Sequence, residues 1–130
     1  MEEQVERKVV GKRAKGTASK DVVSIKLDED AIRERAYEIS QQGPSWDDSV
    51  WFLAEAELRL QPAYDNPRLA PSSLAELGNV IQVNPKHVAD QPSEDYIRAL
   101  AEKIAQSSPR LEELHWFVAE RRWILDQLHL

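Results

Sequence analysis

The sequence predicts a small, mostly α-helical protein with a core of four helices. Three observations lead to this class. The chain has 130 residues, the usual size of one domain. Its 42% hydrophobic and 31% charged residues are typical of a globular protein with enough apolar side chains for a core. One stretch of the chain also repeats itself, and both copies carry apolar residues at helical spacing.

The repeat appears when the chain is aligned with itself without a gap, so that residues 29–60 lie over residues 94–125. Thirteen of the 32 aligned positions are identical, among them Trp51 with Trp116. The chain therefore contains a tandem duplication. We expect two homologous helical hairpins, related by a pseudo-twofold axis, that pack together because a lone hairpin is too small to fold unaided.

The chain begins with residues 1–20, which we expect to form a flexible basic arm. Residues 7–20 carry a local charge of +6, whereas residues 21–130 carry −9. A polar segment of this kind offers little apolar surface to offset its ordering. We interpret it as a solvated leader, as a segment that folds back on the acidic body, or as a docking segment. In the last case an acidic or phosphate-rich partner surface would be bound by Arg7, Lys8, Lys12, Arg13, Lys15 and Lys20.

The first hairpin is predicted within residues 21–60. Asp28 can cap a helix whose apolar residues recur at helical spacing, and Gly43-Pro44 ends that helix. Ser45 with Asp48 favours a new helix start, so that a return helix covers residues 46–60.

Residues 61–92 form a connector with five prolines, in which Ser72 or Ser73 can cap a short helix through Gly78. Residues 22–27 and 80–83 have strand character and are expected to pair as a small two-stranded ribbon.

The second hairpin is predicted within residues 93–130. Ser108-Pro109 separates its helices, with Ser108 as the cap of a return helix over residues 110–127.

Counting from the turns gives two candidate ion pairs. Arg33 lies eleven residues before Pro44 and Glu55 lies eleven residues after it, which in an antiparallel hairpin places them at the same height. Arg98 and Glu120 repeat this arrangement about the second turn. We expect structural ion pairs across each hairpin, because a general acid or base needs a pocket and nothing in the sequence marks one.

The four tryptophans fall into two groups. Trp51 and Trp116 are equivalent in the repeat, so both are expected in the core. Trp46 and Trp123 align with leucines, so the repeat does not demand an aromatic residue there. We therefore regard Trp46 and Trp123 as candidate partner-contact residues, with ordinary core filling as the alternative.

No catalytic, cofactor-binding or metal-binding motif is found, and the chain has no cysteine. His87, His115 and His129 are scattered, and we interpret His115 as a helix-surface or interface residue. We therefore expect no enzymatic activity and no cofactor. No stretch is long and apolar enough to cross a membrane, and the start of the chain has no signal-peptide pattern, so we expect a cytoplasmic protein.

Residues 73–90 imitate a DNA-binding helix-turn-helix, with apolar residues at the expected places and Asn84-Pro85 opening the second helix. The second helix would offer few cations, and the surrounding body is acidic, whereas phosphate neutralisation dominates DNA affinity. DNA binding is therefore kept as an alternative that is not favoured.

Residues 32–58 read IRERAYEIS…GPSWDDSVWFLAEAEL. They resemble a short bacterial family of domains of unknown function, whose members read R-A-Y-E-[IL]-W, then a glycine, then a W-L-x-A-E-x-E-L helix. Ser40 stands near the position of the family's first tryptophan, and the second copy keeps Trp116, Ala119 and Glu120 without the Arg-Ala-Tyr core. The resemblance implies a helical hairpin in a bacterial cytoplasmic protein and no substrate. Together with the charge pattern, it favours a non-catalytic interaction, adaptor or assembly subunit that binds another protein.

Overall fold

The computed structural model describes residues 21–64 and 73–129, and the basic arm, residues 1–20, lies outside the described residues. The described chain is mostly helical with one small antiparallel sheet, as predicted. Its elements are β1 (Val23–Lys26), α1 (Glu29–Gln42), α2 (Trp46–Leu60), the 3-10 helices η2 (Gln61–Ala63) and η3 (Leu74–Leu77), β2 (Val80–Val83), the 3-10 helix η4 (Pro85–His87), α3 (Glu94–Gln106) and α4 (Leu111–Gln127).

The helix starts follow the repeat. The first residues of α1 and α3, Glu29 and Glu94, are aligned in the two copies, and so are the first residues of α2 and α4, Trp46 and Leu111. The caps predicted for the first copy are confirmed. Asp28 Oδ1 accepts a hydrogen bond from the Ala31 N–H at 3.1 Å, and Ser45 Oγ accepts one from the Asp48 N–H at 3.0 Å.

The two interhelical turns use the same backbone conformation with different residues. Gly43 ends α1 with φ 68°, in the left-handed region that glycine adopts without a steric penalty. Its equivalent in the second copy is Ser108, which also has a positive φ, 50°. The prediction that Ser108 caps α4 is wrong, because α4 begins at Leu111 and Arg110 precedes it. The Arg110 N–H instead donates to Glu113 Oε1 at 2.9 Å.

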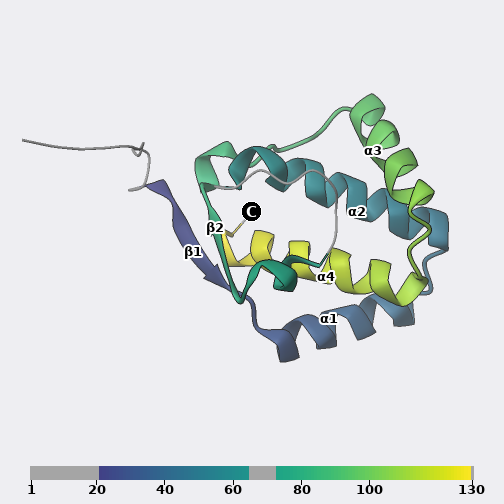
Figure 1. Cartoon of the computed structure of the whole chain (residues 1–130), viewed down its shortest axis with the longest axis horizontal. Coiled ribbons are helices and arrows are strands. Elements are labelled where there is room, and N and C mark those ends of the chain that lie inside the picture. Colours follow the sequence, from purple (N-terminus) through teal and green to yellow (C-terminus); the bar gives the residue numbers. More distant parts are fainter. Residues whose placement is uncertain (1–20, 65–72, 130) are drawn as a thin grey trace, which may run out of the picture.

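The helices pack with partners from the other copy. α1 packs on α4, α3 packs on α2, and α2 packs on α4. In Figure 1, α4 accordingly lies between α1 and α2. The two helices within each hairpin have few contacts with each other. The prediction that the two copies pack together is confirmed, but the closely packed antiparallel pair expected inside each hairpin is wrong.

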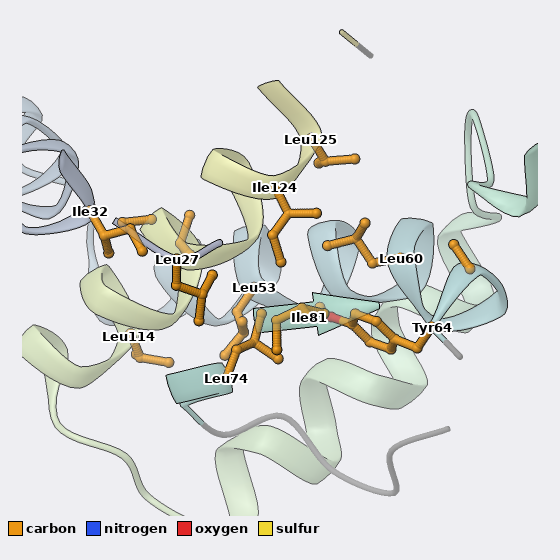
Figure 2. Packing of buried hydrophobic residues seen from close by; sticks show 14 of the residues in the cluster. Leu27, Ile32, Leu53, Leu60, Tyr64, Leu74, Ile81, Leu114, Ile124 and Leu125 are labelled. Carbon is orange, nitrogen blue, oxygen red and sulfur yellow. The ribbon is translucent and has the colours of Figure 1, made fainter. Parts of the chain in front are cut away.

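The predicted ribbon is confirmed. β1 pairs antiparallel with β2, with Val23 opposite Val83 and Lys26 opposite Val80. Ile25 and Leu27 on the first segment and Ile81 and Val83 on the second are buried against the helices. Figure 2 shows how side chains from the ribbon, the helices and η3 gather in one core, which includes Leu27, Ile32, Leu53, Leu60, Tyr64, Leu74, Ile81, Leu114, Ile124 and Leu125.

Candidate partner-binding surface

A cluster of fully buried charged side chains lies inside the core. Glu57 of α2 and Arg121 of α4 are both fully buried, and Arg121 Nε donates to Glu57 Oε1 at 2.9 Å. The Tyr64 hydroxyl donates to the same oxygen at 2.9 Å. The guanidinium also donates to the Phe117 carbonyl at 3.1 Å. These bonds supply the partners that a buried charge requires.

Glu120 of α4 extends this cluster to η3. Its carboxylate accepts hydrogen bonds from the Ser73 hydroxyl at 2.9 Å, the Leu74 N–H at 3.0 Å and the Ala75 N–H at 3.2 Å. Arg121 donates to it at 3.4 Å. The predicted short helix is thus a 3-10 helix whose first N–H groups are satisfied by a distant carboxylate, while the Ser73 hydroxyl makes no capping bond.

The cluster is sealed, because the side chains of Glu57, Glu120 and Arg121 have no solvent exposure. A substrate in solution therefore cannot reach it in this conformation. Its role is to connect α2, α4 and the connector, and we assign it to the fold.

The predicted ion pairs across each hairpin are wrong. Arg33 pairs within its own helix, with Asp30 at 2.9 Å and Glu29 at 3.5 Å, and Arg98 pairs in the same way with Asp95 and Glu94. Glu55 is exposed, whereas its equivalent Glu120 is buried and bonded to η3. The prediction failed because it assumed that the helices of one hairpin lie side by side, while α1 packs on α4 and α3 on α2.

All four tryptophans lie at the margin of the core, half-buried and packed against it. Trp51 and Trp116 were predicted in the core, and this is confirmed in part, because both pack against the core but stay half-buried. Trp46 is also half-buried, and its indole N–H donates to the Pro109 carbonyl at 2.7 Å. This hydrogen bond connects the α3–α4 turn to the start of α2, so Trp46 stabilises the fold.

Trp123 lies beside an open groove along β1. The groove has a volume of about 520 Å³. It is bordered by β1, the start of α1 and the end of α4, and its lining residues are Ser24, Ile25, Lys26, Leu27, Asp28, Glu29, Trp123 and Gln127.

The position of the Trp123 ring is fixed from two sides. Its indole N–H donates to the Lys26 carbonyl at 3.2 Å. The Arg35 guanidinium lies 5.8 Å from the ring centroid, in the range of a cation–π contact, and Arg35 itself pairs with Asp126. Of the two tryptophans singled out from the sequence, the structure places Trp123 at a surface groove and Trp46 at a turn.

The groove follows the edge of β1 that faces away from β2. The Leu27 N–H donates to the Asn79 carbonyl at 2.7 Å, so Leu27 directs its backbone groups toward the β2 side. In an antiparallel ladder every second residue does the same, which here means Ile25 and Val23. By the alternation of an antiparallel ladder, the backbone groups of Ser24 and Lys26 point to the opposite edge. The Lys26 carbonyl is held by Trp123, and no described residue bonds to the N–H groups of Ser24 and Lys26 or to the Ser24 carbonyl.

A second groove of about 310 Å³ lies between α2, α4 and the chain at Asp90. Arg122 lies over the Phe52 ring, 5.4 Å from its centroid, and Arg59 Nε donates to the Ala89 carbonyl at 3.1 Å. Two acidic and two basic side chains line this groove, so it has no clear preference for a charge: Glu55, Asp90, Arg59 and Arg122.

Residues 73–90 do not form the helix-turn-helix considered from the sequence. They contain η3, then β2, then η4, so no long second helix is available to enter a DNA groove. Residues 80–83 form a strand and not part of a helix, because their side chains are alternately exposed and buried and their backbone pairs with β1.

His115 is buried, so its interpretation as a helix-surface or interface residue is wrong. Its Nε2 atom has no hydrogen-bond partner among the described residues. Burial lowers the pKa of His115 below its ordinary value of 6.5, and the nearby Glu112 carboxylate partly opposes this shift. Among residues 21–64 and 73–129, no three histidine, aspartate or glutamate side chains are placed to hold a metal ion.

Two features were missed from the sequence, the buried pair of Glu57 with Arg121 and the edge of β1 that faces the groove. The buried pair does have a signal in the sequence. Glu57 lies four residues after Leu53 and three before Leu60, inside the apolar stripe of its helix. Arg121 likewise lies three residues before Ile124. A single charge in such a stripe demands a partner, and one carboxylate with one guanidinium indicates a buried pair. The second feature, the edge of β1 that faces the groove, has no such signal, because it depends on which edge of the strand pairs with β2 in the folded protein.

Comparisons with models of protein families, with curated proteins and with solved structures gave no match. The resemblance of residues 32–58 to a bacterial family stays a prediction. No helix in the described part of the chain has the length and apolar character needed to span a membrane.

Proposed function

We propose that this protein is a non-catalytic protein-binding subunit of a cytoplasmic assembly, and that its partner is bound along the free edge of β1. The observation that carries the proposal is this edge, where the N–H and carbonyl of Ser24 and the N–H of Lys26 face a groove beside Trp123, which holds the Lys26 carbonyl. An extended segment of another protein can add a strand to such an edge through main-chain hydrogen bonds. Trp123 then offers aromatic contact area, which is common at interface hot spots.

The sealed position of the charged cluster supports a binding role over chemistry. Its carboxylates and guanidinium are occupied by one another and by η3, and none is exposed. Trp123, in contrast, lines an open groove.

We also propose that the two copies of the repeat are related by a pseudo-twofold axis near the contact of α2 with α4. The packing of α1 on α4 and of α3 on α2 supports this, because exchanging the two copies converts one contact into the other. The ribbon lies outside the repeat, so this symmetry supplies one edge and one groove of this kind, not two.

The binding proposal is tested by selecting short displayed peptides on the full chain and counter-screening them on Ser24→Pro. Proline removes the outward N–H of residue 24 but leaves the ladder to β2, and edge strands tolerate it. Tyr96→Ala on α3, whose side chain is exposed, is the matched control.

We expect selected peptides to bind the parent chain and the control equally, to lose at least tenfold in affinity for Ser24→Pro, and to shift Trp123 fluorescence. Trp123→Phe, which keeps a ring, serves as a second variant and should weaken binding less than Trp123→Ala. Peptides that bind all variants alike, or a selection that enriches none, would overturn the proposal.

A further inference from the structure

We infer that residues 1–20 of this chain occupy the β1 groove when no partner is bound. This inference rests on the binding site proposed above and adds the segment that competes for it. The segment is joined to the strand that borders the groove. Residue 20 directly precedes Asp21, and β1 begins soon after, at Val23, so the segment starts at one end of the free edge.

The length of the segment is sufficient for this placement. β1 itself is short, so an added strand that matches Val23–Lys26 and a reversing turn together use only part of residues 1–20. Val9-Val10 supplies the β-branched residues that strands favour, and Gly11 and Gly16 lie between them and β1, where the chain must reverse. The covalent link also keeps the segment at a high effective concentration near the edge.

The charges favour a register in which the start of the basic run reaches the acidic end of the groove. A segment running back antiparallel to β1 brings its earlier residues toward the end of the groove where Asp28 and Glu29 lie. Arg7 and Lys8, which begin the run of six basic side chains, reach this end when Val9-Val10 lies beside β1, and registers that place Glu2, Glu3 or Glu6 there are disfavoured. Opposite charges at this end favour one register of the added strand.

A docked segment leaves the strand edge unavailable to other chains. An open edge invites pairing with any extended peptide, including a second copy, and proteins commonly cover such edges. The partner proposed above must then displace residues 1–20, so its apparent affinity is lowered by the fraction of molecules in which the groove is occupied.

The test uses the full chain, which has no cysteine, so that Gln4→Cys gives a single site for a nitroxide label. We expect the label to broaden the amide signals of Lys26 to Glu29 and the Trp123 indole signal in NMR spectra. The broadening should disappear in Ser24→Pro and in Arg7→Glu/Lys8→Glu, and it should weaken at high salt. A label at Gln106→Cys at the end of α3 is the control and should leave these signals sharp.

Three results would overturn the inference. Broadening centred on Asp21 and unchanged by the variants would indicate a segment without a preferred place. Broadening transferred to an unlabelled chain in a mixed sample would identify a second copy as the occupant. A selected peptide that binds the parent chain and Arg7→Glu/Lys8→Glu with equal affinity would show that the segment does not compete, while leaving the binding site itself intact.

Discussion

Arg121 of α4 donates through Nε to Glu57 of α2 at 2.9 Å, and neither side chain has any solvent exposure. This bond crosses the central contact between the two copies of the repeat, since α2 belongs to the first and α4 to the second. Their equivalents in the opposite copies are Ala56 and Arg122. The charged contact therefore occurs once, and the duplicated halves have diverged where they meet.

Arg121→Met should lower the free energy of unfolding by about 3–5 kcal/mol, because it leaves two buried carboxylates without their guanidinium. Arg122→Met is the matched control, since Arg122 is the next residue and lies over Phe52 at the surface. We expect that control to cost less than about 1 kcal/mol. Denaturant unfolding measures both, and equal losses would contradict the role given to the buried pair.

Glu120→Ala should accelerate hydrogen exchange at the amides of Leu74 and Ala75, because both donate to that carboxylate. The loss of charged hydrogen bonds in a buried site should also destabilise the protein by about 2–3 kcal/mol. Its repeat equivalent, Glu55, is exposed, so Glu55→Ala should leave both amides protected. If the two substitutions affect these amides alike, Glu120 does not hold the start of η3.

Ser108→Gly should stabilise the protein by up to about 1 kcal/mol, because a serine in the left-handed region is strained and glycine is not. Gly43→Ala should have the opposite effect, a loss of about 1 kcal/mol. A Cβ at Gly43 meets no atom within 4 Å, so the loss comes from the backbone alone. Thermal unfolding of the two variants checks this pair, and changes of the same sign would refute it.

Acid should destabilise the fold through His115. Its pKa in the folded protein lies below 6.5, so the unfolded chain binds a proton more readily. The contribution of the neutral imidazole is complete above pH 6.5 and is lost as the pH falls toward the lowered pKa.

His115→Val, which copies the repeat equivalent Val50, should therefore flatten the dependence of the unfolding free energy on pH below 6.5. Urea unfolding at several pH values makes the comparison, and an unchanged slope in His115→Val would rule out His115 as its source.

The helices were predictable from the sequence because caps, breakers and apolar spacing are local signals. Asp28, Ser45 and Gly43 act where those signals placed them. The packing partner of each helix was not predictable in this way, since α1 is adjacent to α2 in the chain but packs on α4. The ion pair expected of Arg33 failed for that reason.

The candidate site was predictable in part. Trp123 stood out because the repeat does not require an aromatic residue there, and it lines the groove. The strand 22–27 was also expected, but which of its edges pairs with β2 and which faces the groove was not. That outcome depends on tertiary packing, which no local pattern encodes.

The exchange of packing partners has a consequence for how the chain is made. Ile32 and Ile39 on α1 are buried, and the main helical partner of α1 is α4, the last helix of the described chain. During synthesis, the apolar face of α1 therefore stays exposed to solvent until α4 has emerged from the ribosome. Nascent chains stalled before Leu111 should be sensitive to protease and bound by chaperones, and native compaction should follow the emergence of α4.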